Sequence, residues 1–124
     1  MTEVLLQRYF EAWRHHDSEL VRQLFAEDAT YSILGHRKLR GVEAIVQYWD
    51  RNTAIVDDLS CGVHNATSTA AGVVATWSAQ FTRTDRKQRM HLEGMLWLEI
   101  SDGIIAHLTE CYINVAAAGK AILG

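Results

Sequence analysis

The 124-residue sequence contains no proline, although about six would be expected at the usual frequency of roughly 5%. Its turns must therefore use glycine, aspartate, asparagine and serine. Cysteine is scarce as well, because Cys61 and Cys111 are the only two in the sequence. Two cysteines argue against a disulfide framework and against a cysteine-rich zinc site. We therefore expect a reducing compartment and a cytoplasmic location.

An excess of positive charge is also absent, since the formal net charge is −3 at pH 7. This charge argues against a nucleic-acid-binding protein. No apolar run approaches the roughly 18 residues of a membrane-spanning helix. The opening residues Met1-Thr2-Glu3 lack the basic and apolar leader of a signal peptide. We therefore expect one globular domain over residues 1–124, with neither a nucleic acid nor a membrane as partner.

The first half of the sequence has the periodicity of amphipathic helices. Its second helical segment follows Asp17-Ser18, where either side chain can cap a helix. Its third follows Gly41 and carries an apolar stripe that ends at Trp49. Helices are thus predicted over residues 3–16, in the segment 18–25 and after Gly41, with a short strand at 29–34 and a polar, basic loop at 35–41.

After residue 58 the apolar period changes from 3.6 to 2, which is typical of strands with one buried face. Strands are predicted over residues 59–69, 72–84, 90–100 and 104–115, and residues 116–124 form a small-residue tail with room for one helical turn. Ser101-Asp102-Gly103 is a tight hairpin signal. Helices followed by hairpin-linked strands predict an α+β fold in which helices cover one face of an antiparallel sheet.

Several sequence motifs then resemble one known family. They are Arg8-Tyr9-Phe10-Glu11-Ala12-Trp13, Leu24-Phe25-Ala26-Glu27-Asp28-Ala29-Thr30, Gly41-x-x-x-Ile45-x-x-Tyr48-Trp49, and Leu92-x-Gly94-Met95-Leu96-x-Leu98 followed by Asp102-Gly103-x-Ile105. Together they resemble the SnoaL-like and ketosteroid-isomerase-like superfamily, whose fold is shared with nuclear transport factor 2. The resemblance implies a cone-shaped, cystatin-like roll of three N-terminal helices on a curved antiparallel sheet.

Members of this family place a pocket between the curved sheet and the helices. The resemblance and the strand parity together imply which side chains point into it. The expected pocket residues are Trp13, Tyr31 or Ile33, Trp49, Trp77, Phe81, Leu92, Leu108 and Tyr112. An aromatic cavity of this kind suits a small, cyclic, largely apolar ligand.

Glu110 is the strongest candidate for chemistry. It lies in the otherwise apolar segment 104–113 and has the parity of Leu108 and Tyr112. A carboxyl group surrounded by apolar side chains has a raised pKa, and such a group can act as a general acid or base near neutral pH. The alternative is a glutamate at the pocket rim that pairs with a basic side chain.

The resemblance adds Tyr9 and Asp17 as catalytic candidates. Tyr9 matches the tyrosine that hydrogen-bonds the substrate oxyanion in ketosteroid isomerases. Asp17 matches an acid that works with a strand histidine in dehydratase relatives, and His64 is the nearest such histidine. The alternatives are a tyrosine packed in the core and a helix N-cap worth ~1 kcal/mol.

The sequence departs from each catalytic set that the family offers. The isomerase base falls on Ile33, and the protonated aspartate of the isomerases falls on or beside Gly94. The arginine and aspartate of the limonene-epoxide-hydrolase-like members fall on Trp77 and Ala79. A cofactor-independent enzyme of the isomerase, cyclase, dehydratase or epoxide-hydrolase type therefore stays open beside a non-catalytic binding protein.

A protein-protein adaptor that uses the outer sheet face is the third possibility. The outward parity of His91, Met95 and Trp97 predicts a homodimer through this face, unless the C-terminal tail covers Trp97. The histidines show no metal-ligand spacing, and the sequence has no cofactor motif, so neither is expected. The basic residues around Arg37 and Arg86 lack interleaved aromatic residues, which favours solvated turns over a nucleic-acid site.

Overall fold

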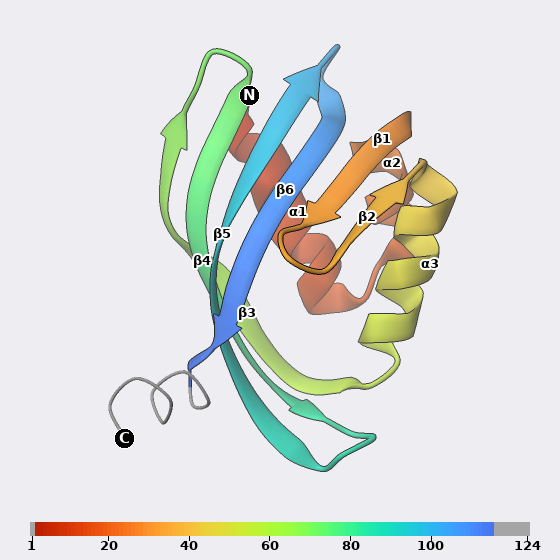
Figure 1. Ribbon diagram of the computed structural model, residues 1–124, viewed down its shortest axis with the longest axis vertical. Coiled ribbons are helices and arrows are strands. Elements are labelled where there is room, and N and C mark those ends of the chain that lie inside the picture. The colour runs from red at the N-terminus through yellow and green to blue at the C-terminus, as the bar shows by residue number, and fades with distance from the viewer. Residues whose placement is uncertain (1, 116–124) are drawn as a thin grey trace.

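The computed structural model, which describes residues 2–115, contains the three predicted helices and one six-stranded sheet, which has one strand more than the sequence predicts (Figure 1). The elements are α1 (Thr2–His15), α2 (Ser18–Leu24), β1 (Phe25–Ile33), β2 (Arg37–Arg40), α3 (Val42–Thr53), β3 (Val56–Ser68), β4 (Gly72–Arg83), β5 (Gln88–Ser101) and β6 (Ile104–Asn114). The predicted α+β architecture is confirmed. The tail at 116–124, with its predicted helical turn, lies outside the described residues.

The strand order in the sheet is β2-β1-β6-β5-β4-β3. Neighbouring strands run antiparallel except β1 and β6, which run parallel with Tyr31 beside Leu108 and Ile33 beside Glu110. The prediction of a purely antiparallel sheet is therefore wrong at this one pair. A long crossover through α3 and the β3–β5 hairpins joins the two strands, and a crossover connection is what a parallel pair requires.

Strand β2 occupies the segment that the sequence predicts to be a polar loop. Gly35 and Gly41 flank it with φ values of 81° and 88°, a left-handed conformation that glycine adopts without a steric cost. Three of its four residues, Arg37, Lys38 and Arg40, are basic. Charged side chains are common on edge strands because they discourage pairing with other chains, and here they hide the strand from a periodicity analysis.

The β1 strand begins at Phe25, although the sequence predicts this residue on the second helix and the strand only from Ala29. Phe25 has extended backbone angles, and its ring packs edge-on against Tyr9 with centroids 6.3 Å apart. Tertiary packing of the ring thus ends the helix early. The longer strand brings Tyr31 and Ile33 onto the sheet face that meets the helices.

The core lies between the helices and the inner face of the sheet, and Figure 1 shows the helices on one side of the bent strands. Alternation along β4 to β6 buries the side chains with the predicted inward parity. The outer face carries exposed apolar side chains at Met95, Trp97 and Ile113. Within residues 2–115, no helix is both long and apolar enough to cross a membrane.

Candidate active site

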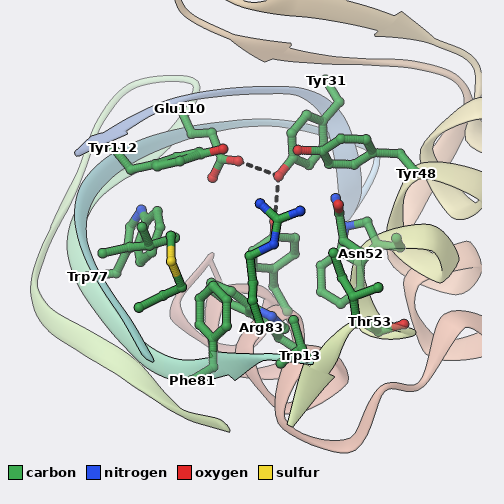
Figure 2. Close-up of a pocket in the computed structure, with 16 residues that line it drawn as sticks. Trp13, Tyr31, Tyr48, Asn52, Thr53, Trp77, Phe81, Arg83, Glu110 and Tyr112 are labelled. Carbon is green, nitrogen blue, oxygen red and sulfur yellow. Dashed lines mark hydrogen bonds between the residues drawn. The ribbon is translucent and has the colours of Figure 1, made fainter. Parts of the chain in front are cut away.

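A cavity of about 220 Å³ lies between the inner sheet face and helices α1 and α3 (Figure 2). Its lining is mainly aromatic and comprises Tyr9, Trp13, Tyr31, Tyr48, Trp49, Asn52, Thr53, Ile55, Val56, Trp77, Phe81, Arg83, Met90, Leu92, Glu110 and Tyr112. Ile33 and Leu108, which the sequence analysis also placed in the pocket, are buried in the core but do not line it. Trp13, Trp49 and Trp77 lie in the wall of the cavity and do not fill it.

Glu110 reaches the cavity because its inward parity on β6 places it beside Ile33 of β1 and Leu96 of β5. Its side chain is only 6% exposed. Among the described residues it is the only polar or charged side chain that is buried. A charge at this depth has no bulk water around it, so its protonation state depends on the neighbouring groups.

The hydroxyl of Tyr31 donates a hydrogen bond to Glu110 Oε1 at 2.5 Å, and Tyr9 Oη lies 3.3 Å from Tyr31 Oη. Tyr31 stands beside Leu108, two residues before Glu110, so its long ring carries the hydroxyl to the carboxyl group. Because Tyr31 gives its single proton to Glu110, the proton between the two tyrosines comes from Tyr9. The three groups form one hydrogen-bonded chain along the cavity wall.

Burial raises the pKa of Glu110 from its usual 4.5 to about 7, and the hydrogen bond from Tyr31 opposes this rise. Burial and the nearby Glu110 carboxyl raise the pKa values of Tyr9 and Tyr31 well above the usual 10.0. Burial also raises the pKa of Tyr48 to about 12. At neutral pH the tyrosines are therefore proton donors, whereas Glu110 populates both of its forms.

Gly94 explains how a tryptophan fits into this wall. Gly94 pairs with Trp77 on β4 and with Tyr112 on β6. A Cβ atom at residue 94 would lie 2.5 Å from Trp77 Cζ2 and 2.7 Å from the carbonyl oxygen of Cys111. The indole therefore occupies the space that a side chain at position 94 would need. Trp77 Nε1 is itself buried and has no hydrogen-bond partner within residues 2–115.

Three lining residues reach the surface: Asn52, at the end of α3, is exposed, and Thr53 and Arg83, at the ends of α3 and β4, are partly exposed. We call this solvent side of the cavity the mouth. Arg83 donates to Asp85 through Nε at 3.0 Å and through Nη2 at 2.8 Å. Arg83 is one of the basic residues around Arg86 for which the sequence favours a solvated turn. The missed signal is its parity, which is that of Trp77 and Phe81.

Tyr48 and Asn52 were also missed as pocket residues. The predicted apolar stripe of the third helix ends at Trp49, and it leaves out the polar residues of the next turn. Tyr48 and Asn52 are four residues apart, and so are Trp49 and Thr53, so each pair shares a helix face. Extending the stripe by one turn irrespective of polarity finds all four residues.

Asp17 does not line the cavity. Its carboxylate caps α2 and accepts a hydrogen bond from the backbone N–H of Leu20 at 3.0 Å. His64 lies at the opposite side of the sheet, where its Nε2 is 3.9 Å from Glu93 Oε1. The structure therefore does not bring the aspartate and histidine of the dehydratase pattern together. Within the described part of the chain, no cluster of three or more His, Cys, Asp or Glu residues suits a metal ion.

Comparison with known proteins gives a family match and a set of similar folds. The profile of the SnoaL-like domain family matches residues 6–108. No curated protein matches the sequence significantly. An LEH-like epoxide hydrolase from M. tuberculosis superposes with a TM-score of 0.76 at 17% identity, over 98% of this chain and 89% of the other.

Two further solved structures have a similar fold. The epoxide hydrolase/cyclase-like enzyme SalBIII, studied for pyran ring formation in the polyether salinomycin, gives a TM-score of 0.80 at 15% identity over 90% of both chains. A protein with a ketosteroid isomerase-like fold from Catenulispora acidiphila, in complex with trimethylamine, gives 0.77 at 16% identity over 86% of this chain and 82% of the other. At such identities the similarity establishes the fold, and the chemistry must come from the site.

Proposed function

Because the chain belongs to the SnoaL-like domain family, we propose that it is a cofactor-independent enzyme that performs acid–base chemistry on a small, largely apolar, cyclic ligand. One observation carries this proposal. A buried carboxyl group, Glu110, faces a cavity of ligand size and has a tyrosine hydroxyl as its hydrogen-bond partner. Burial places the pKa of Glu110 at about 7, and a general acid or base works best when its pKa lies near the working pH.

Glu110 has one oxygen left for the ligand. Tyr31 bonds to Oε1, and among the described residues no donor reaches Oε2. In the protonated form, Oε2 can give its proton to an epoxide, carbonyl or leaving-group oxygen. In the ionised form, the same atom can remove a proton next to a carbonyl group. Both directions suit the isomerisation, elimination, ring-opening and cyclisation reactions that the fold is known to support.

Tyr31 stabilises the carboxylate that remains after Glu110 has given up its proton. The hydrogen bond from Tyr31 goes to Oε1, which shares the negative charge once Oε2 has lost its proton. Tyr9, the tyrosine that the family resemblance assigns to the substrate oxyanion, contacts Tyr31 in this structure. We therefore assign Tyr9 to the support of Tyr31 and assign Asp17 no part in the reaction.

The experiment is a turnover screen with cyclic ketones, epoxides and lactones. The Glu110→Gln variant should lose about 10²- to 10⁴-fold in kcat, which is the usual contribution of a general acid or base. Glu93→Gln is the matched control, because Glu93 lies on the neighbouring strand and faces outward. Equal turnover by wild type and Glu110→Gln would contradict the proposal.

A non-catalytic binding protein on the same fold is the second candidate. The observation in its favour is that the indole of Trp77 occupies the space where isomerase relatives carry an acid, at or beside Gly94. Quenching of the fluorescence of the cavity tryptophans by the same panel separates the two functions. Saturable quenching without turnover in the wild-type protein would favour a binding protein.

We also propose a homodimer through the outer sheet face, defined here by His91, Glu93, Met95 and Trp97 on β5. Met95 is 48% exposed and Trp97 is 42% exposed in the isolated chain. A tryptophan and a methionine side by side in water are unfavourable for a monomer. If the chain is instead a monomer, the same patch becomes the site at which a protein-protein adaptor would bind its partner.

A further inference from the structure

Arg83 and Glu110 are the two charged side chains that line the cavity. Glu110 is buried in the wall, whereas Arg83 lies at the mouth beside Asn52 and Thr53. Figure 2 shows the guanidinium of Arg83 pointing in among the other lining side chains. The walls between the two charges are formed by aromatic and aliphatic side chains. The cavity is therefore mainly apolar, with a partly exposed guanidinium toward solvent and a buried carboxyl group deeper in the wall.

The guanidinium of Arg83 is oriented by hydrogen bonds, but some of its N–H groups have no acceptor within residues 2–115. A guanidinium has five N–H donors. Nε and Nη2 of Arg83 each donate one hydrogen bond to Asp85. No acceptor for the other three N–H groups is found within residues 2–115. Asp85 thus orients the planar group, and the remaining donors stay available to an oxyanion, which guanidinium groups bind in a forked geometry.

We propose that the ligand is an amphipathic anion: an apolar ring body that fills the aromatic cavity and a carboxylate that Arg83 binds at the mouth. Arg83 then determines specificity, and Asp85 acts as its positioning residue. The proposal deepens the proposed function, on which it rests, because it names the class of ligand for the same site. The anionic group lies at the mouth, so the reacting end of the ligand points toward Glu110.

The two ends of the site also fit together electrostatically. An anionic group placed next to Glu110 would disfavour the carboxylate form of this residue. Placed at the mouth, the same group pairs with the guanidinium and leaves Glu110 free to exchange its proton. A ligand of this shape can enter in one orientation only, and a fixed orientation is what brings a reacting atom to the catalytic group.

The test compares two probes of the same size, 1-naphthylacetate and 1-naphthylacetamide, by quenching of tryptophan fluorescence at pH 6. At this pH the arylacetate is ionised, while Glu110, with a pKa of about 7, is mainly neutral. We expect the carboxylate to bind about tenfold more tightly than the amide, in line with one charge-assisted hydrogen-bonded pair. Arg83→Met should abolish this preference and change the Kd of the amide by less than about twofold.

Arg86→Met is the matched control, because it removes the same charge from the same hairpin. Arg86 does not line the cavity. It should keep the preference. Equal binding of the two probes by the wild type, an equal loss in Arg86→Met, or the loss of both probes in Arg83→Met would each overturn the proposal. If Arg83→Met fails to fold, Arg83→Lys decides, since lysine keeps the charge but not the fork. An unchanged preference in Arg83→Lys would exclude recognition by the guanidinium.

The binding test does not require turnover, so the two proposals fail separately. A preference for the carboxylate without turnover by any member of the panel would support the anion site and contradict the enzyme. Turnover without a preference for the carboxylate would support the enzyme and contradict the anion site. Glu110→Gln should keep the preference of the wild type for the carboxylate probe, because the anion binds at the other end of the cavity.

Discussion

Glu93 and Glu110 lie on neighbouring strands of the same sheet and face opposite sides of it. The side chain of Glu93 is 42% exposed and lies near two histidines, with Oε2 at 2.9 Å from His91 Nε2. Glu110 is 6% exposed, and its partner is the neutral hydroxyl of Tyr31. Glu93 thus lies on a solvent-exposed surface beside histidines, whereas Glu110 is buried in the wall of an aromatic cavity.

The surroundings of a carboxyl group thus decide whether it serves as a surface charge or as a candidate catalytic group. On the outer face, Glu93 is half exposed to water and lies within reach of the rings of His91 and His64. On the inner face, burial raises the pKa of Glu110, and among the described residues no cationic side chain contacts it to oppose this rise. A buried carboxyl group without a cationic partner, at the wall of a cavity, is a functional candidate on physical grounds.

The largest expected effect is on the pH dependence of stability. Glu110 has a pKa of about 7 in the folded protein and 4.5 in the unfolded chain. Between these values the unfolded chain ionises first, so the stability contributed by neutral Glu110 is complete below pH 4.5 and is lost as the pH rises to 7. The wild type should lose about 3 kcal/mol relative to Glu110→Gln over this range, measured by urea unfolding. Glu93→Gln should retain the slope of the wild type, and parallel curves for wild type and Glu110→Gln would contradict the assignment.

The second effect concerns Gly94, beside Trp77 in the inner wall. Gly94→Ala places a Cβ atom 2.5 Å from the indole of Trp77 and should destabilise the fold by about 1–3 kcal/mol, as overpacking does. Gly62→Ala on β3 is the control, because no atom lies within 4 Å of the new Cβ there. Its stability should stay within about 0.5 kcal/mol of the wild type. Thermal unfolding of both variants tests this, and equal melting temperatures would show that the wall tolerates the extra carbon.

A third effect separates the two tyrosines of the hydrogen-bonded chain. The hydrogen bond from Tyr31 lowers the pKa of Glu110, so Tyr31→Phe should raise it above 7 and cost about 1–2 kcal/mol of stability at pH 8. Tyr9→Phe leaves this bond in place and should shift the pKa little. Titration of the Glu110 carboxyl carbon by NMR measures both pKa values. The same shift in the two variants would show that the tyrosines act on Glu110 through packing alone.

The smallest effect on folding belongs to the outer face. Trp97→Glu should turn the expected homodimer into a monomer in sedimentation and change the free energy of unfolding of the subunit by no more than about 0.5 kcal/mol. Val4→Glu is the control, because Val4 is also an exposed apolar residue but lies on α1. It should leave the mass unchanged. The same sedimenting mass for wild type and Trp97→Glu would remove the outer face as the dimer contact.

Most of the fold could be predicted from the sequence, because amphipathic periodicity determines which side of each long element is buried. The inward parity of Trp77 and Glu110 is an example. The β2 strand could not be predicted, since its side chains are charged and its pairing depends on the distant β1. The parallel pairing of β1 with β6 is likewise a matter of topology and leaves no local signal.

The site was harder to predict than the fold. Parity brings Glu110 to the cavity, but the identity of its partner depends on where the ring of Tyr31 reaches across two strands. The resemblance to the family pointed to Tyr9 instead, whose hydroxyl contacts that of Tyr31 and not the carboxyl group of Glu110. Arg83 was misread because its charge was given more weight than its position on the strand.

Because the indole of Trp77 packs against Gly94, amino-acid changes at these two positions depend on each other. An acid at position 94 requires that the indole first be removed, and removal of a buried tryptophan costs about 3–5 kcal/mol. Introducing the acid first forces it into the indole, at the 2.5 Å separation described above. Either first step is harmful, and even without the indole the carbonyl oxygen of Cys111 would lie 2.7 Å from a Cβ atom at position 94. Such epistasis separates this chain from an isomerase-type wall, because a side chain at position 94 requires changes both in the indole of Trp77 and in the neighbouring backbone of β6.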